Sequence, residues 1–453
     1  MRWKSYPKYK DSGVAWLREV PEKWDALPLR RVVKTVKTGG TPLGAEEQFF
    51  DNDGFNWFTP IDFSEDLYLK ESTRKLSNIG KDDVRCFPGK TVMMVGIGAT
   101  IGKVGLSINE SSCNQQVNGI VCGVKLTPAF CAYYLNTMRD FIFNCGKFTT
   151  LPIINQDETK SLIITIPSKN EQAAIADFLD RETGHLDTLI AKKQALIGLL
   201  KEKRTALISQ TVTRGLPADS AREFGLEPHT RFRDSGIEWL GEVPEAWEVQ
   251  STRRYLLNHK QGYYSSAPYV DEGIKLLRIS DFVGDGRMST SQCPRVEACE
   301  ELAQYLLREG DFVFARTGGA GSFAMIKELN ESLAFAAYLI RFRFERAKVD
   351  LPFLRYFFLS ASFQFGITRS IHGGVNQNVH AEDIKNQFCS IPPLPEQTAI
   401  ATYLDRETTK IDDLITKIQA AIERLQEYRT ALITAAVTGK IDVRTAIAKK
   451  EAA

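Results

Sequence analysis

Several glycine-containing loops carry the side chains that could do chemistry in this chain of 453 residues. Each loop places basic or amide side chains close to Gly. Arg reads guanine through paired hydrogen bonds and Asn or Gln reads adenine, whereas Lys, Thr and backbone N–H groups hold phosphates. The set predicts contacts with double-stranded DNA, although plain solvated loops share this composition. The candidate contact residues are Lys37, Thr38, Gly39, Gly40, Thr41, Lys103, Lys147, Lys260, Tyr263, Tyr264, Arg278, Arg316, Thr317, His372, Asn376, Gln377 and Asn378.

Motifs that would make the chain an enzyme fail on their spacing. The run from Gly96 to Gly102 is one residue too long for a dinucleotide fingerprint, and Gly102-Lys103 is followed by Val104 rather than the Ser or Thr of a P-loop. Pro392-Pro393 lacks the flanking residues of an amino-methyltransferase site. The eight Cys contain no C-x-x-C pair and the five His are scattered, which argues against zinc. The sequence predicts no catalytic residue, no metal site and no cofactor held by this chain.

Composition indicates a soluble protein with local rather than global basic surface. Lys and Arg number 58 against 56 Asp and Glu, so the formal net charge is only +2. A hydrophobic fraction of 43% with 25% charged residues is ordinary for globular chains. No apolar run approaches the roughly 18 residues of a membrane span. The N-terminal residues also lack the apolar core of a secretory signal, which predicts a cytoplasmic location.

The elements that must position these loops are duplicated. DSGVAWLREVPEKW at 11–24 returns as DSGIEWLGEVPEAW at 234–247, and EQAAIADFLDRET at 171–183 returns as EQTAIATYLDRET at 396–408. A unit of more than 200 residues is too long for a solenoid repeat and indicates two similar domains. The segments between the matched ends resemble each other far less. Matched cores alone are one explanation; two different recognition tasks on one frame is the explanation we favour.

Each copy ends in a long predicted helix with an apolar stripe. The stripe repeats about every 3.5 residues, which is typical of a coiled-coil seam. Thr183-Gly184 predicts a break in the first helix, and Gly215 and Gly439 predict the two helix ends. We expect the helices to pair antiparallel; each rod of ~40 Å is close to the ~34–36 Å of one DNA turn. The predicted seam and docking residues are Leu186, Leu189, Leu196, Leu200, Leu207, Ile411, Leu414, Ile418, Leu425 and Leu432.

Between the repeated ends, short β-rich runs alternate with a few helical stretches, around 129–143 and 351–365, which predicts a mixed α/β class. The expected fold is two globular α/β target recognition domains, separated by two long helices that form an antiparallel intramolecular coiled coil with pseudo-two-fold symmetry. The predicted divisions are a first recognition domain at 1–165, helical regions at 166–215 and 391–440, a second recognition domain at 216–390, and a tail at 441–453.

The doubled order of these motifs resembles the specificity subunit of type I restriction-modification systems. The resemblance covers nearly the whole chain and rests on the repeats above, on GATIGKV and RTGGAGS inside the variable segments, and on IPSKNEQAAIADFLDRET and IPPLPEQTAIATYLDRET before the long helices. One departure is Val95-Gly96-Ile97-Gly98, where the family often has an Arg-Thr-Gly loop like Arg316-Thr317-Gly318.

The resemblance implies a non-catalytic DNA reader that recognises a bipartite asymmetric site, one half for each domain. It further implies two modification subunits, which use S-adenosylmethionine to methylate adenine N6, and two restriction subunits that use ATP and Mg. Two alternatives remain open at this stage. One is a DNA methyltransferase with an unrecognised site, and the other is a coiled-coil assembly protein that reads no sequence.

Overall fold

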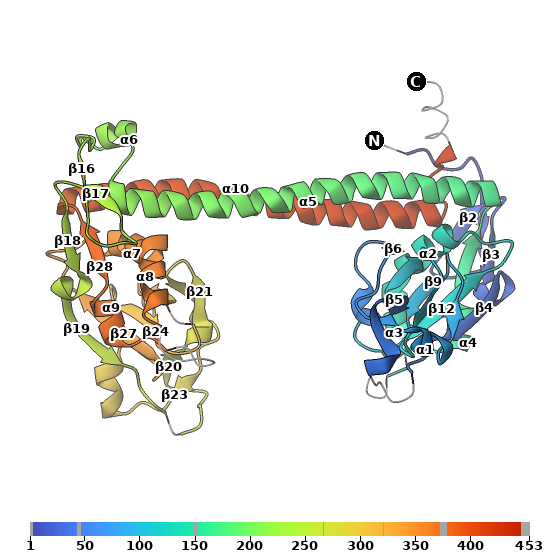
Figure 1. Cartoon of the computed structure of the whole chain (residues 1–453), viewed down its shortest axis with the longest axis horizontal. Helices are drawn as coiled ribbons and strands as arrows, with labels where there is room; N and C mark the ends of the chain where they lie inside the picture. Colours follow the sequence, from blue (N-terminus) through green and yellow to red (C-terminus); the bar gives the residue numbers. More distant parts are fainter. Residues whose placement is uncertain are drawn as a thin grey trace. The chain divides into compact units, whose positions relative to one another are not determined.

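The structure is a computed structural model that describes residues 3–42, 47–145, 147–148, 152–265, 267–319, 321–371 and 378–444 (Figure 1). The chain divides into two units. Unit 1 is Met1–Lys193 with Ala420–Ala453, and unit 2 is Gln194–Gln419. Unit 1 is therefore built from both ends of the sequence, whereas unit 2 is one continuous segment.

Two sheets of more than two strands lie in the described part of unit 1. The larger has the order β4-β12-β9-β10-β6 and the smaller β7-β5-β11-β8. Strand β9 reads VMMV and all four residues are buried, as expected for a short apolar run inside a sheet. The strands are β4 (Val33–Thr38), β12 (Val117–Cys122), β9 (Val92–Val95), β10 (Val104–Ser107), β6 (Tyr68–Leu69), β7 (Lys75–Leu76), β5 (Phe50–Phe58), β11 (Ser111–Cys113) and β8 (Cys86–Phe87).

Short strand pairs and helices complete unit 1. The strand pairs are β1 (Tyr9–Asp11) with β2 (Glu19–Pro21), β3 (Asp25–Pro28) with β15 (Ile163–Ile166), and β13 (Lys147–Phe148) with β14 (Pro152–Ile153). The helices are α1 (Asn78–Asp82), α2 (Pro128–Thr137), α3 (Arg139–Cys145) and α4 (Gln156–Ser161). Helix α2 packs on β9, β10 and β12 and on β15, so it lies in the core of the unit.

Unit 2 repeats this plan. Its larger sheet has the order β19-β27-β24-β25, matching β4-β12-β9-β10, and its smaller sheet has the order β23-β20-β26. These strands are β19 (Leu256–Gln261), β27 (Leu339–Phe344), β24 (Phe312–Ala315), β25 (Phe323–Met325), β23 (Arg295–Val296), β20 (Ile274–Leu277) and β26 (Leu333–Phe335). The remaining pairs are β16 (Phe232–Asp234) with β17 (Glu242–Pro244), β18 (Glu248–Ser251) with β28 (Phe388–Ile391), and β21 (Phe282–Gly284) with β22 (Arg287–Met288).

The helices of unit 2 are α6 (Ala218–Glu223), α7 (Leu351–Leu359), α8 (Ala361–Arg369) and α9 (Ala381–Lys385). The sequence predicts one helix around 351–365, but Ser360 separates α7 from α8. The Ser360 side chain accepts a hydrogen bond from the Phe363 N–H and so starts the second helix. In unit 1 a single helix expected around 129–143 is likewise divided, at Met138 between α2 and α3. The predicted mixed α/β class and tandem repeat are confirmed.

Two long helices, α5 (Lys169–Arg214) and α10 (Leu394–Val437), each contribute one part to each unit. In unit 1 the Thr165 hydroxyl donates to the Val437 carbonyl at 2.7 Å, and Arg429 pairs with Asp187. In unit 2 the Ser390 hydroxyl donates to the Val212 carbonyl at 3.0 Å. The helices therefore run antiparallel within each unit and lie side by side (Figure 1).

The predicted break in the first helix is wrong, because α5 continues through Thr183 and Gly184. Thr183 is buried and its hydroxyl donates to the Leu179 carbonyl at 2.8 Å, while a Cβ on Gly184 would meet no atom within 4 Å. Tertiary packing thus outweighs the ~1 kcal/mol that an internal Gly costs. The predicted ends are confirmed: α5 stops at Arg214 before Gly215 at φ +85°, and α10 stops at Val437 shortly before Gly439 at φ +74°.

The seam has the predicted period, but every second position lies one residue later than predicted. Leu189, Leu196 and Leu414 are 42%, 43% and 44% exposed, so their placement in the seam is wrong. Their neighbours Ile190, Ile197 and Ile415 are the less exposed members of each pair. The other predicted seam residues are buried or half-buried: Leu186, Leu200, Leu207, Ile411, Ile418, Leu425 and Leu432.

Matching hydrogen bonds attach the sheet layer to the long helices in both units. Tyr133 of α2 donates to Asp180 of α5 at 2.7 Å, and Tyr356 of α7 donates to Asp405 of α10 at 2.5 Å. Burial, together with the nearby carboxylate, raises the pKa of each tyrosine above the ordinary value, so both phenols stay protonated. The frame that carries the variable loops is thus fixed in the same way twice.

Candidate nucleic-acid interface

The loops that follow β9 and β24 occupy equivalent places in the two units. In unit 2 the Arg316 N–H donates to the Tyr338 carbonyl at 2.8 Å, and the Arg316 carbonyl accepts from the Val379 N–H at 2.8 Å. Thr317 forms a bridge with Asn378, and its hydroxyl donates to the Asn378 side chain at 2.6 Å. The loop backbone is therefore held on both sides, which leaves the half-exposed Arg316 side chain on a rigid base.

In unit 1 the same loop begins with Gly96. Its carbonyl accepts from the Ile154 N–H at 2.9 Å, and Ile97 bridges to Ile153. A Cβ on Gly96 would lie 2.9 Å from Nδ2 of Asn118 and 3.0 Å from the Ile154 carbonyl oxygen. A side chain at position 96 would thus crowd Asn118 and Ile154, which gives the departure from an Arg-Thr-Gly loop a steric reason.

A second equivalent pair lies at the ends of β4 and β19. An added Cβ would meet the Cys113 carbonyl oxygen at 2.0 Å on Gly39 and the Ala336 carbonyl oxygen at 2.0 Å on Gly262. Both glycines are needed because two backbones approach closely there. Gly39 is thereby explained by packing. The residues that follow differ: Gly40 and Thr41 in unit 1, but Tyr263 and Tyr264 in unit 2.

These tyrosines line a cavity of about 350 Å³ in unit 2. Exposed rings surround it: Tyr264 is 73%, Tyr338 61% and Tyr269 57% exposed. Large exposed aromatic rings gathered around one hollow are unusual on a surface that binds nothing, and such rings stack readily on nucleic-acid bases. We name this hollow the tyrosine cavity.

Arg278 stands at the edge of the tyrosine cavity with its guanidinium fixed. Its Nη2 lies 3.2 Å from Oδ1 of Asp281 and donates to the Gln292 carbonyl at 2.8 Å. The hydrogen bond to Asp281 raises the pKa of Arg278, so its positive charge is permanent. Predicted residues Tyr263, Tyr264 and Arg278 therefore meet in one place, and Arg316 is joined to the same place through Tyr338.

Sequence reasoning missed Tyr269 and Tyr338 as lining residues. The signal that could have revealed Tyr338 is its position directly before β27, opposite the Tyr263-Tyr264 pair at the end of β19 in the antiparallel β19–β27 pairing. Tyr269 lies in an irregular segment and gives no comparable signal.

The other candidates of unit 1 make contacts within the protein. Lys37 is exposed on β4, the Thr38 hydroxyl donates to the Asn118 side chain at 2.8 Å, and Thr41 is hydrogen-bonded to Gln115. Lys103 lies elsewhere: its Nζ donates to the Phe63 carbonyl at 3.0 Å, in a small pocket that also contains Arg429 of α10. Lys103 is thus not brought together with Lys37–Thr41.

The remaining candidates are only partly described. In unit 2 Lys260 donates to Gln304 and lies over the Tyr305 ring at 4.8 Å. Lys147 has a described backbone in β13, whereas His372, Asn376 and Gln377 lie outside the described residues. No contact of these residues with DNA is tested, and their roles stay predictions.

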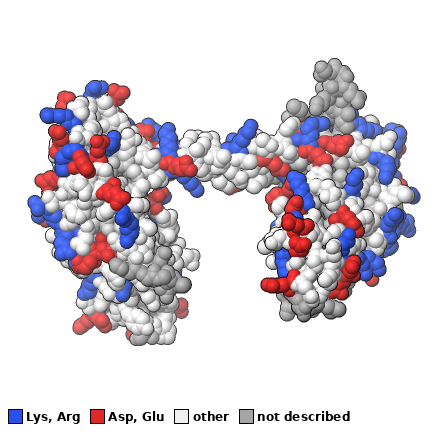
Figure 2. All heavy atoms as spheres, in the orientation of Figure 1, with Lys and Arg blue, Asp and Glu red and all other residues white. Residues whose placement is uncertain are grey.

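Charge and metal chemistry add little to this surface. On the face seen in Figure 2, side chains of both signs are interspersed over both units, in keeping with the net charge of +2. Within the described ranges, no group of three or more His, Cys, Asp or Glu is arranged to hold a metal. A search of those same ranges finds no helix that is long and apolar enough to cross a membrane.

One frame built twice, with unlike side chains at the same loop positions, defines a binding protein with two recognition surfaces. Comparison with known proteins gives the family. The model for the type I restriction modification DNA specificity domain matches residues 21–198 and 282–424. The chain belongs to this family.

Individual relatives agree along nearly the full length. The chain is 23% identical over 436 residues to the MjaVIII specificity subunit of Methanocaldococcus jannaschii, covering 94% of both chains. It is 24% identical to the EcoKI specificity subunit of Escherichia coli, covering 80% of this chain and 77% of that one.

Solved structures share the fold. A chain from a type I restriction-modification system matches with a TM-score of 0.65 at 16% identity, covering 93% and 99% of the two chains. The HsdS subunit from Thermoanaerobacter tengcongensis matches with a TM-score of 0.51 at 14% identity, covering 93% and 98%. The predicted resemblance is confirmed.

Proposed function

We propose that this chain is the DNA-reading subunit of a type I restriction-modification complex and that each unit recognises one half of a bipartite, asymmetric DNA target. The observation that carries the proposal is the repeated frame with different loop side chains. Gly96, Thr41 and Gln116 in unit 1 stand where unit 2 has Arg316, Tyr264 and Tyr338. Two identical readers would prefer a palindrome, whereas two unlike readers require an asymmetric site.

In unit 2 the tyrosine cavity and Arg316 form the reading surface. Arg316 supplies paired donors for a guanine edge, the exposed rings give apolar faces for bases, and Arg278 supplies a fixed charge near the sugar-phosphate backbone. In unit 1 the corresponding surface consists of Lys37, Thr38 and the Gly40–Thr41 segment. Its smaller and more polar side chains suit a different base sequence.

The long helices serve as the spacer and as the docking surface. Exposed Leu189, Leu196 and Leu414 leave the seam and remain available to another protein. Two modification subunits bind there, supply S-adenosylmethionine and methylate adenine N6. Restriction subunits that use ATP and Mg join them. The chain performs no chemistry itself, and the complex acts on DNA in the cytoplasm.

The decisive experiment is a genome-wide map of N6-methyladenine in cells that express the modification subunit with and without this chain. We expect one new bipartite motif whose appearance depends on the chain. Methylation that is unchanged by the chain, or that follows a single continuous motif, would contradict the proposal. S-adenosylmethionine binding by the isolated chain would favour a methyltransferase, and equal binding of specific and random duplexes would favour a non-reading assembly protein.

A further inference from the structure

Arg204 of α5 joins three separate segments of unit 2. Its Nη1 and Nη2 donate to the two oxygens of Asp285 at 3.1 and 3.0 Å, which is the paired geometry of a guanidinium and a carboxylate. Its Nε lies 3.0 Å from Oδ1 of Asp412 on α10. The Arg204 side chain is only 13% exposed, so it is held between the two helices and the sheet layer.

Asp285 forms the tip of the β21–β22 hairpin. Gly284, Asp285 and Gly286 have φ angles of +85°, +54° and +66°, so three successive residues lie in the left-handed region. The Asp285 carbonyl also accepts from Nε and Nη2 of Arg355 at 3.0 and 2.8 Å. A tip with this uncommon backbone is thus tied down by arginines on both its carboxylate and its carbonyl.

The hairpin leads directly to the tyrosine cavity. Arg278, Ile279 and Ser280 line the cavity, and Asp281, which holds Arg278, comes immediately before β21. A backbone hydrogen bond also closes the base of the hairpin: the Ser289 N–H donates to the Asp281 carbonyl at 2.8 Å. Only a few residues of ordered backbone therefore separate the Arg204 contact from the reading surface.

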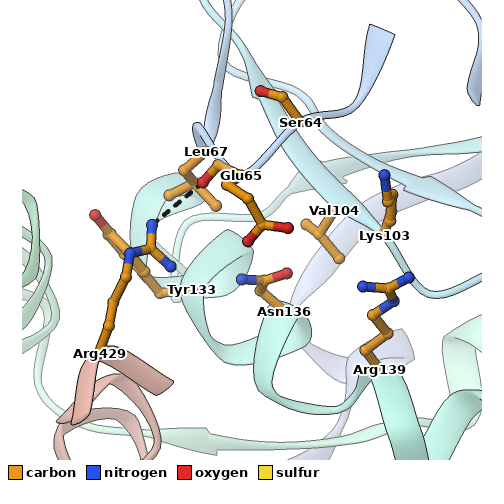
Figure 3. A pocket seen from close by; sticks show the side chains of 9 residues that line it. All are labelled: Ser64, Glu65, Leu67, Lys103, Val104, Tyr133, Asn136, Arg139 and Arg429. Carbon is orange, nitrogen blue, oxygen red and sulfur yellow. Dashed lines mark hydrogen bonds between the residues drawn. The ribbon is translucent and has the colours of Figure 1, made fainter. Parts of the chain in front are cut away.

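Unit 1 has the same device in the repeat-equivalent place. Arg429 follows Arg204 by 225 residues, and its partner Asp187 precedes Asp412 by 225 residues. Nε of Arg429 lies 2.9 Å from Oδ1 of Asp187, and the Arg429 side chain is 12% exposed. Its Nη2 donates to the Glu65 carbonyl at 3.2 Å (Figure 3).

The unit 1 segment corresponds to the unit 2 segment in sequence as well. Asp62 of unit 1 and Asp281 of unit 2 each accept a hydrogen bond from the backbone three residues earlier, and each is followed by Phe. Glu65 comes three residues after Asp62, so the arginine meets the equivalent part of the chain. The contact is to a backbone carbonyl in unit 1 and to a carboxylate in unit 2.

From this repeated contact we infer that Arg204 and Arg429 are positioning residues for DNA recognition: each fixes the orientation of its recognition surface on the paired helices, and together they set which spacer length between half-sites is accepted. The inference rests on the proposed function. A partly buried ion pair is weak evidence for stability, and its better-attested use is to fix one arrangement among several. Equivalent arginines contact the equivalent segment in both units, which supports the view that these contacts fix one arrangement here.

The test uses the full chain assembled with its modification subunits. Methylation is measured on duplexes that keep both half-sites and change the spacer by one or two base pairs. Arg204→Gln should reduce discrimination against the altered spacers by roughly tenfold, with half-site preferences unchanged. Asp285→Asn should do the same, and it keeps the hairpin foldable because Asn tolerates positive φ.

Asp187→Asn should produce the corresponding relaxation from unit 1. The matched control is Asp219→Asn, which removes the same charge from an exposed pair with Arg222 and should leave spacer choice unchanged. If Asp285→Asn and Asp187→Asn both retain the wild-type spacer profile, the inference is overturned; a uniform loss of methylation on all spacers also overturns it. A wild-type complex that methylates without regard to either half-site refutes the proposed function instead.

Discussion

Units 1 and 2 share a topology but differ in what they present around the same loops. Unit 2 surrounds its hollow with Tyr264, Tyr269 and Tyr338 and adds a rigidly based arginine. Unit 1 has Gly96, Thr41 and Gln116 at the positions of Arg316, Tyr264 and Tyr338. The interior differs in the same direction: the core of unit 2 contains a cluster of phenylalanine rings, including Phe312, Phe314, Phe323, Phe358 and Phe363, in mutual edge or tilted contact.

The comparison teaches that the frame and the contents of this fold vary independently. The tyrosine–aspartate hydrogen bonds from α2 and α7 to the long helices are retained in both units, whereas loop and core side chains are not. A unit can therefore change what it reads without changing how it is mounted. Three predictions sharpen or break this view.

The largest effect is expected in the core. Phe358 of α7 and Leu135 of α2 are repeat-equivalent and fully buried. Phe358→Ala should destabilise unit 2 by ~3–5 kcal/mol and Leu135→Ala should destabilise unit 1 by ~2–5 kcal/mol, because each leaves a cavity. Phe358→Leu, which installs the unit 1 residue, should cost less. Hydrogen exchange resolved by segment measures both units at once; equal loss of protection in both units from either variant would show that their cores are not independent.

A smaller effect is expected at the reading loop. Arg316→Ala should cost ~1–3 kcal/mol of discrimination at one base pair of one half-site, because a guanidinium on a firmly held backbone can read one guanine. Methylation of duplexes with single base-pair substitutions measures it. Arg316→Gly makes the loop resemble that of unit 1 and should give the same result. Unchanged methylation of every duplex would remove Arg316 from the reading surface and weaken the contrast between the units.

The smallest effect is expected on the stability of unit 2 at acidic pH. Burial, followed by the nearby Lys385, lowers the pKa of His259, whose ring stacks on Phe342 with centroids 5.8 Å apart. The unfolded chain therefore binds a proton more readily than the folded one. The contribution of His259 to the free energy of unfolding is complete above the ordinary histidine pKa of ~6.5, and it declines as the pH falls below that value.

His259→Gln should remove the loss of stability that His259 causes in unit 2 at acidic pH. Unit 1 has Val36 at the equivalent position, so this residue should cause no such loss there. Denaturant unfolding of wild type and variant at pH 5.5 and 7.5 isolates the difference between them. An identical acid slope in both proteins would mean that His259 is not the group responsible.

The tandem repeat and the ends of the long helices could be predicted from sequence, because repeated motifs and the Gly residues at helix ends are local signals. Which residues form the seam between the helices could not be predicted in full. Leu189-Ile190, Leu196-Ile197 and Leu414-Ile415 offer two adjacent apolar residues at each turn, so periodicity alone cannot choose between them. In each pair the β-branched member is the less exposed one in the structure. Because every second seam position lies one residue later than the sequence predicts, Arg204 and Arg429 enter the seam, and the predicted pattern did not include them.

The candidate interface was predicted in part for a similar reason. Arg316, Tyr263, Tyr264 and Arg278 come from three segments, and their proximity depends on strand pairing that composition does not encode. Lys103 shows the opposite error. It follows Gly102 in a loop rich in Gly, yet its position directly before β10 directs its side chain toward Phe63 and the helix pair.

The division of the chain also has a consequence for protein synthesis. Unit 2 is continuous and is complete once Gln419 has left the ribosome, although its sequence is made second. The core of unit 1 includes Leu432, Ile433, Val437 and Val443 packed with residues as early as Tyr6 and Trp24. At ~5–20 residues per second, the unit that is made first waits until Val443 has been translated, and Phe178 and Leu179 stay exposed meanwhile. During synthesis, unit 2 can therefore complete its fold before unit 1 can.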